Sequence, residues 1–324
     1  MNKKILNRIL KKSRHPGLLE ALTEKLSLTD LQSLLLKVYQ TKSQKLTPKD
    51  LVTQYSQNRF VKPAQIDPRE IIKFDLHAYS LLPKEFSILE LSPVCPLGTN
   101  SVLAPISQNN TVSTIRNTEV CSDPTGVLAI ECALRRQTLY SQNPRSTKTI
   151  KLGTSSRVLR AQAFDEPAAF AHFRIFALCT AGRDQGSFLF EIESLKEQIN
   201  YYLELLTKAD AIHFDVKGVR VLFVIYNLDF LNNFESKILH PLKSSHPQIQ
   251  FEIDTDNSSG REYYSLLRFQ MFAQNAAGEE CFLIDGGFTD WTQQLLSNKK
   301  ERLLTSGMGS ERFIYCFGKK NMEY

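Results

Sequence analysis

The chain has 324 residues, of which 42% are hydrophobic and 23% are charged, a composition typical of globular proteins. Its formal net charge of +6 comes from 40 basic and 34 acidic residues. No apolar run approaches the roughly 20 residues that a membrane-spanning helix needs, and no apolar segment with a small-residue cleavage site follows the basic start. Six scattered cysteines form no CxxC pair and no zinc-like spacing with histidine. We therefore expect a cytoplasmic protein with reduced thiols, no membrane association and no metal site.

The first 65 residues read as a small helical segment. Lys3, Lys4 and four further basic residues precede the first acid, and apolar residues recur among them at helical spacing. This arm could face RNA or a membrane surface, or it could be a solvated helix whose apolar stripe docks on the body. Residues 28–39 have helical spacing, and Thr47-Pro48-x-Asp50 is typical of a helix start. We predict a domain boundary near residue 65.

Helices and strands then alternate up to residue 207. Asp67-Pro68 opens a helix that ends at Pro83, and a strand follows at residues 88–91. Short β-branched runs predict strands joined by turns between residues 101 and 120, and a helix over 126–137. Further strands are predicted at 157–160 and 173–180, joined by the loop Phe164–Ala171, before a long amphipathic helix at 188–207.

The remaining chain continues the same alternation. We predict a strand at 219–226, a helix at 232–242, and paired strands at 266–274 and 280–284 around a turn. The end of the chain reads as a helix, a turn rich in glycine at Gly307, and a last helix. Strands separated by hairpins and helical insertions favour an α+β fold, with a mainly antiparallel sheet flanked by helices.

The C-terminal stretch contains the sharpest motif. It reads Asp285-Gly286-Gly287-Phe288-Thr289-Asp290-Trp291 and, later, Gly307-Met308-Gly309-Ser310-Glu311-Arg312. Glycines let the backbone approach a ligand closely, and an arginine in a first helical turn can meet a polyphosphate. A plain turn with a surface arginine is the alternative. The stretch resembles motif 3 of class II aminoacyl-tRNA synthetases, in the histidyl branch, and the resemblance implies that Arg312 binds the γ-phosphate of ATP.

A second motif lies around Arg160. Arg160-Ala161-Gln162, a loop, and His172-Phe173-Arg174-Ile175-Phe176 resemble motif 2 of the same family, whose two arginine-bearing strands clamp the α-phosphate and the adenine of ATP. A fixed guanidinium would stabilise the charge that develops on the α-phosphate during in-line attack. Gln162 stands where the family has a glutamate. Arginines on the surface of an edge hairpin are the alternative.

Two segments resemble the family's amino-acid site. A carboxylate and a hydroxyl two residues apart, as in Asp123-Pro124-Thr125, can both accept hydrogen bonds from one ammonium group, although the same triplet also suits a helix start. The segment that ends in Tyr263-Tyr264 resembles the Arg-Gly-x-x-Tyr-Tyr motif of the histidyl branch. The resemblance also assigns Gly286 and Gly287 to substrate binding.

The sequence departs from the family pattern at specificity positions. The supporting arginine before the tyrosine pair falls on Ser259, and the residues that read histidine fall on Leu178 and Gly182. A buried imidazole would find few polar partners there, so histidine is not expected as the substrate. Residues 87–96 loosely resemble motif 1, which implies a homodimer.

The resemblance implies a class II core over residues 66–324, with an insertion around 208–258. It implies ATP and Mg²⁺ as cofactors and activation of an amino acid or related carboxylate as an acyl-adenylate, for transfer to a tRNA, a carrier protein or a small molecule. The second hypothesis is a non-catalytic paralogue, similar to the regulatory subunit of ATP phosphoribosyltransferase, that senses a ligand. A structural or nucleic-acid-binding module is the third.

Overall fold

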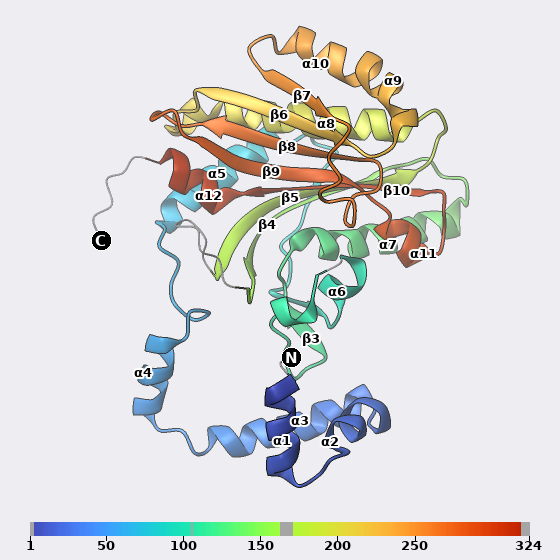
Figure 1. The fold of residues 1–324 in the computed structure, drawn as a ribbon. Coiled ribbons are helices and arrows are strands. Elements are labelled where there is room, and N and C mark those ends of the chain that lie inside the picture. Colours follow the sequence, from blue (N-terminus) through green and yellow to red (C-terminus); the bar gives the residue numbers. More distant parts are fainter. Residues whose placement is uncertain (1–2, 105, 163–170, 319–324) are drawn as a thin grey trace.

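The computed structural model describes residues 3–104, 106–162 and 171–318. One eight-stranded sheet forms the centre of the molecule (Figure 1). Its strands follow the spatial order β1 (Ser87–Ile88), β4 (Ile150–Leu159), β5 (His172–Arg183), β10 (Glu301–Gly309), β9 (Glu280–Thr289), β8 (Leu267–Gln274), β6 (Gly218–Ile225) and β7 (Gln250–Asp254). The outermost pairs are parallel and all five inner pairs are antiparallel. The predicted mainly antiparallel α+β sheet is therefore confirmed.

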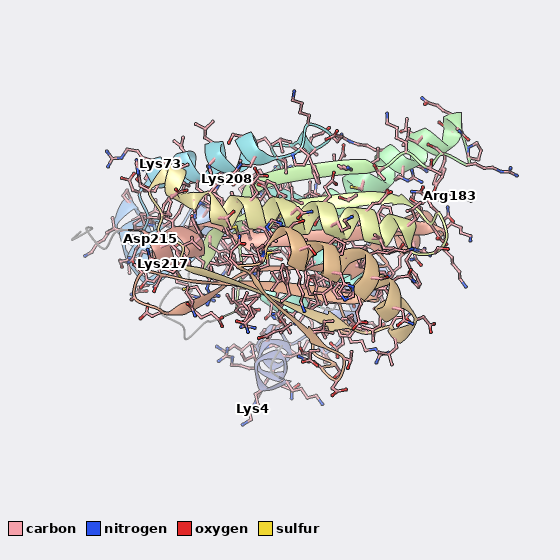
Figure 2. All side chains as sticks on the ribbon, turned by 90° about the horizontal axis from the view of Figure 1, so that it is seen from above. Lys4, Lys73, Arg183, Lys208, Asp215 and Lys217 are labelled. Atoms are coloured by element: carbon pink, nitrogen blue, oxygen red, sulfur yellow. The ribbon has the colours of Figure 1, made fainter. Side chains whose placement is uncertain are left out.

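One face of the sheet is covered by the larger apolar core. The helices on it are α5 (Pro68–Leu81), α8 (Leu189–Thr207), α9 (Leu231–Phe234), α10 (His240–Ser245) and α12 (Ser310–Phe317). A π-helical turn at Glu235–Leu239 joins α9 to α10. Seen from above, α8 runs along the sheet between Arg183 and Lys208 (Figure 2). Even-numbered side chains of β5, such as Phe176 and Leu178, point into this core because strand residues alternate between the two faces.

The opposite face carries a smaller core. Here α7 (Pro124–Gln142), α11 (Trp291–Leu296) and α6 (Thr99–Leu103) cover the sheet, and odd-numbered residues of β5, such as Ile175 and Ala177, face them. A buried ion pair ties this layer to the first residue of β10. Arg136 of α7 donates to both carboxylate oxygens of Glu301, at 2.9 and 3.1 Å. The pair fixes the start of the strand that leads to Arg312.

The N-terminal 57 residues of the chain include α1 (Lys3–Ser13), α2 (Leu18–Glu20), α3 (Leu28–Ser43) and α4 (Pro48–Gln57). The predicted helix starts are confirmed, since Ser27 caps α3 and Thr47 forms a capping box with Asp50. These helices lie apart from the sheet and bury no residue (Figure 1). The segment after α4 meets the body where Arg59 donates to the carbonyl of Gln162 at 3.0 Å. The division at residue 65 and the insertion at 208–258 remain proposals.

Two predicted elements are wrong. The strands expected between residues 101 and 120 are replaced by α6, a short 3₁₀ turn (Gln108–Asn110) and a single strand, β3 (Thr118–Val120), which pairs with β2 (Val94–Pro96). The expected glycine turn at residue 307 is the central strand β10. The strand expected at residues 88–91 is only the two-residue β1.

Buried Glu119 explains the first difference. Its carboxylate accepts hydrogen bonds from the backbone of Gly98 and Asn100 and from the side chains of Asn100 and Gln108. Burial alone would raise the pKa of Glu119, but these donors lower it below its usual value. The carboxylate therefore organises the segment as turns, against the β-branched preference of its residues.

Candidate active site

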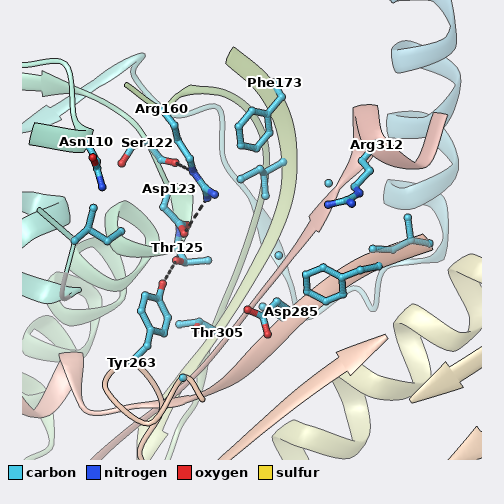
Figure 3. A pocket seen from close by; sticks show the side chains of 18 of the residues that line it. Asn110, Ser122, Asp123, Thr125, Arg160, Phe173, Tyr263, Asp285, Thr305 and Arg312 are labelled. Atoms are coloured by element: carbon cyan, nitrogen blue, oxygen red, sulfur yellow. Dashed lines mark hydrogen bonds and ion pairs between the residues drawn. The ribbon is translucent and has the colours of Figure 1, made fainter. Parts of the chain in front are cut away.

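A cavity of about 760 Å³ opens on the face of the sheet that carries α7. Its walls come from the end of β4, the strands β5, β9 and β10, the start of α7, and the turn before β8 (Figure 3). Nine of the twelve side chains or glycines predicted for the site line it: Asp123, Thr125, Arg160, Gln162, Tyr263, Tyr264, Gly307, Gly309 and Arg312. The fold thus brings together segments that lie far apart in the sequence.

The first wall is the N-terminus of α7. Asp123 is its N-cap, and one carboxylate oxygen accepts from the backbone N–H and the hydroxyl of Thr125, at 2.9 and 2.7 Å. The other oxygen lies 3.7 Å from the guanidinium of Arg160. The Thr125 hydroxyl lies 3.4 Å from the Tyr263 hydroxyl, so a chain of polar groups runs along this wall (Figure 3).

Arg160 stands at the end of β4. Its Nε donates to the carbonyl of Ser122 at 3.1 Å, and its guanidinium carbon lies 5.1 Å from the centre of the Phe173 ring. Gln162 also lines the cavity, and its backbone carbonyl accepts a hydrogen bond from Arg59. The predicted loop at 164–171 falls, up to residue 170, outside the described residues.

The second wall is formed by β10 and α12. Gly307 and Gly309 line the cavity from the strand, and Arg312 enters it from the first turn of the helix, on the side opposite Arg160 (Figure 3). A side chain at Gly307 would have its Cβ 3.3 Å from Ile175, which is tighter than usual packing. Glu311 also borders the cavity and is paired with Arg157 of β4.

Arg174 is not brought to the cavity. It lies on the other face of β5, where its Nε donates to the Ser155 hydroxyl at 2.8 Å and its guanidinium pairs with Asp75 of α5 at 3.2 Å. The residues on either side of it, Phe173 and Ile175, line the cavity instead. The alternation of strand side chains explains this placement, and sequence reasoning missed Phe173 because the motif was aligned on the arginine.

Gly286 and Gly287 do not line the cavity either. A Cβ on Gly286 would lie 2.5 Å from Phe269 in the larger core. A Cβ on Gly287 would lie 2.4 Å from the carbonyl of Leu267 and 2.6 Å from the Tyr264 ring. Both glycines therefore serve close packing within the sheet, and Gly287 makes room for Tyr264, which does line the cavity.

The base of the cavity holds an ion pair that the sequence did not point to. Arg268 of β8 donates to both carboxylate oxygens of Asp285 of β9, from Nε at 2.7 Å and from a terminal nitrogen at 3.1 Å. The register of β8 and β9 makes this contact possible, because it places Arg268 opposite Gly287, two residues from Asp285. Nothing in the local sequence pattern indicates this register.

Within the described ranges, no group of three or more His, Cys, Asp or Glu side chains is placed to hold a metal ion. All six cysteines are free, and burial raises the pKa of Cys121 to about 12. No helix in the described part of the chain is long and apolar enough to cross a membrane.

The arrangement can be compared with known proteins. No protein-family model matches the chain, and no curated protein matches it either. Among solved structures, an apo histidyl-tRNA synthetase from S. aureus is similar with a TM-score of 0.58 and 14% identity, over 82% of this chain and 71% of that one. The chain has the class II aminoacyl-tRNA synthetase fold.

Two further structures share this fold. An ATP phosphoribosyltransferase regulatory subunit/histidyl-tRNA synthetase from Bacillus halodurans has a TM-score of 0.51 and 13% identity, over 81% of this chain and 83% of that one. A histidine–tRNA ligase subunit from Alicyclobacillus acidocaldarius has a TM-score of 0.52 and 12% identity, over 78% of this chain and 96% of that one. At such identities the likeness concerns the class II fold alone.

Proposed function

We propose that the cavity binds ATP and an amino acid or related carboxylate and joins them as an acyl-adenylate, which is then passed to an acceptor. One observation carries this proposal. Arg160 and Arg312, which come from opposite ends of the core, line one cavity together with a carboxylate and a hydroxyl at the start of a helix. Cationic groups on facing walls suit a polyphosphate, and the acidic end suits an ammonium group.

ATP would lie between the two arginines. The γ-phosphate would meet Arg312 and the backbone of Gly307 and Gly309, while Arg160 would face the α-phosphate. Attack by the substrate carboxylate develops negative charge on the α-phosphate oxygens, and a fixed guanidinium stabilises that charge. The Phe173 ring beside Arg160 offers a flat apolar surface for adenine, and Gln162 borders the same space.

The substrate's amino group would bind at the start of α7. Asp123 and Thr125 present oxygen atoms to the cavity, and Tyr263 and Tyr264 form the wall beside them. An incoming ammonium group would take the side of Asp123 that Arg160 now faces. Arg160 would then be available to the phosphate, so binding of the two substrates would be coupled through one contact.

Mg²⁺ would accompany ATP as the counter-ion of its phosphates and neutralise part of their charge. Magnesium in such sites is held mainly by phosphate oxygens and water, with one or two carboxylates. Glu311 is the acid beside Arg312, and it would have to release Arg157 to act as such a ligand. The donor set therefore fits a metal carried in with the nucleotide.

The similarity in fold supports further parts of the proposal. We propose a cytoplasmic homodimer that transfers the activated acid to a tRNA, a carrier protein or a small molecule. The six basic residues between residues 3 and 14 would contact an acidic acceptor such as a tRNA.

A non-catalytic role is the second candidate. Gln162 lacks the negative charge that would hold Arg160 towards a phosphate, and Arg160 pairs with Asp123 instead. A cavity of this kind could bind an amino acid or a nucleotide as a signal for a partner protein. The Bacillus halodurans structure, described as a regulatory subunit/histidyl-tRNA synthetase, has the same fold.

Exchange of labelled pyrophosphate into ATP, screened over the amino acids, tests the proposal. We expect exchange with at least one acid, and a loss of about 10²- to 10³-fold in Arg312→Ala, because such a cation acts mainly on the transition state. Arg261→Ala is the matched control, since Arg261 is exposed on the turn before β8 and does not line the cavity.

The outcomes separate the two candidates. Exchange that Arg312→Ala abolishes and Arg261→Ala retains supports the ligase. Absence of exchange with every acid, combined with a ligand-dependent rise in melting temperature, contradicts the ligase and supports the sensor.

A further inference from the structure

The Arg268–Asp285 pair is the feature of the cavity that neither the sequence motifs nor the fold similarity assigns. Both side chains line the cavity, one from β8 and one from β9. The side chain of Arg268 is 16% exposed and that of Asp285 is 34% exposed. The carboxylate is thus the half of the pair that the cavity presents to a ligand.

Arg268 is held by contacts with Asp285, Tyr264 and the turn before β8. It makes two hydrogen bonds to Asp285, and its guanidinium lies 5.9 Å from the centre of the Tyr264 ring. A Cβ built on Gly260 would lie 3.2 Å from its remaining nitrogen, so the turn before β8 packs against it. Arg268 therefore holds Asp285 in place and offers few donors to a ligand.

Asp285 can accept further hydrogen bonds. A carboxylate has about four lone-pair sites. The bidentate arginine occupies one on each oxygen, and the Tyr264 side chain takes another. Burial raises the pKa of Asp285, hydrogen bonds from Arg268 and Tyr264 oppose that rise, and the charge of Asp123 adds to it. Asp123 and Asp285 line the same cavity, and a group that satisfies both carboxylates would be positively charged.

We propose that Asp285 binds the cationic side chain of the acid whose α-ammonium group lies at Asp123 and Thr125, so that the substrate is a basic amino acid or a related diamino acid. This inference rests on the proposed adenylate-forming function. Two carboxylates that line one cavity repel an acidic side chain. A neutral apolar side chain would bury Asp285 without replacing its water, which costs binding free energy.

Arg268 acts as a positioning residue in this arrangement. Its planar fork fixes both oxygens of Asp285, which lysine cannot reproduce because it is a single point charge. Arg268→Lys should therefore raise KM for the basic substrate and leave kcat near the wild-type value. A purely structural role would instead lower the amount of folded protein and leave the kinetic constants of the remainder unchanged.

The test compares pyrophosphate exchange with lysine, ornithine and arginine against exchange with leucine, methionine and glutamate. We expect exchange only with the basic set. Asp285→Asn should reduce kcat/KM for the basic substrate by roughly tenfold to a hundredfold, the value of one charged hydrogen bond. ATP binding, measured by calorimetry, should be unchanged because Asp285 does not face the phosphates in the proposed complex.

Two further variants keep the test independent of folding. Asp256→Asn makes the same chemical change on an exposed bend outside the cavity and should behave as wild type. The double variant Asp285→Asn/Arg268→Gln removes both charges together, so it leaves no unpaired buried ion. It should fold, bind ATP and show a relative gain for neutral acids over basic ones.

Exchange that is specific for basic acids and weakened in both Asp285 variants supports the inference. Exchange with a neutral or acidic amino acid, insensitive to Asp285→Asn, overturns it and leaves the adenylate-forming function standing. No exchange with any acid overturns both, since the inference depends on that function.

Discussion

Replacement of Arg174 by methionine separates two roles for this residue. In the motif-based interpretation Arg174 binds ATP, whereas in the structure it points to the opposite face and holds Asp75. The variant loses two hydrogen bonds to Ser155, at 2.8 and 3.0 Å, and the ion pair with Asp75 at 3.2 Å. It keeps most of the apolar stem, so the change is mainly electrostatic.

The expected cost is about 2 kcal/mol of unfolding free energy. Hydrogen bonds to charged groups contribute roughly 1.5–3 kcal/mol each when buried, and partial exposure of the pair, 25% for Arg174 and 13% for Asp75, reduces that contribution. Because a chain of 324 residues has an unfolding entropy of roughly 2.1 cal/mol/K per residue, the melting temperature should fall by about 3 °C. The dissociation constant for ATP should stay within about twofold of wild type, because Arg174 does not reach the cavity.

The pH dependence of the deficit has a definite sign. Burial already raises the pKa of Asp75 above its ordinary value of 3.8, against the opposing effects of Ser155 and Arg174. Removing Arg174 raises it further. An acid with a raised pKa binds its proton more tightly in the folded state. The free energy of unfolding therefore falls as pH rises from the pKa of Asp75 in the unfolded chain through its pKa in the folded protein. The deficit should therefore shrink on acidification, as Asp75 becomes protonated.

Thermal unfolding monitored by circular dichroism between pH 4 and pH 8, together with calorimetric ATP binding, measures both quantities. Asp75→Asn/Arg174→Met is the matched control, and it should recover at least half of the lost stability because no carboxylate is left unpaired. A tenfold loss of ATP affinity at unchanged melting temperature would refute the structural role.

Two further predictions concern contacts within the sheet and between the sheet and α7. Glu301→Gln leaves the fully buried guanidinium of Arg136 without its counter-charge, so unfolding free energy measured by urea titration should fall by about 3–5 kcal/mol, and a change below about 1 kcal/mol would contradict this. Gly287→Ala places a Cβ 2.6 Å from the Tyr264 ring, so it should destabilise the fold by about 1–3 kcal/mol in the same titration. Gly17→Ala, which meets no atom within 4 Å, should be neutral.

Local signals account for the parts of the fold that were predicted. The starts of α4 and α5 were found because Pro48 and Pro68 each follow a capping residue, Thr47 or Asp67, whose side chain accepts a backbone N–H in the structure. Such caps depend on residues within one helical turn, and a sequence displays them directly. The helix α8 has no such cap and is predicted instead from the helical spacing of its apolar residues.

Non-local contacts account for the parts that were not predicted. The turns before β3 depend on Glu119, which gathers donors from up to 21 residues away. The sequence predicts a turn in place of β10 because Gly307 and Gly309 weaken its strand pattern. In the structure β10 lies between β5 and β9, and its pairing overrides that weakness. Sequence periodicity records neither contact.

In the site, too, residues with local signals were predicted and residues that depend on non-local contacts were not. Asp123, Thr125 and Arg312 are predicted because the short segments that contain them resemble motifs of the class II synthetases. Phe173 was missed by one residue, and one residue decides which face of a strand a side chain occupies. Asp285 lies in the glycine-rich motif, but the motif assigns it no role, because its partner is fixed only by strand register.

The contact between Arg160 and Asp123 bears on the two proposed functions. At 3.7 Å it is longer than a hydrogen bond, and both side chains are partly exposed, at 31% and 22%. Such pairs contribute at most about 1 kcal/mol, so a ligand can open the contact at little cost. An ammonium group would replace Arg160 at Asp123, and a phosphate would replace Asp123 at Arg160. A weak resting pair therefore lets both ligands bind, as the two-substrate ligase requires.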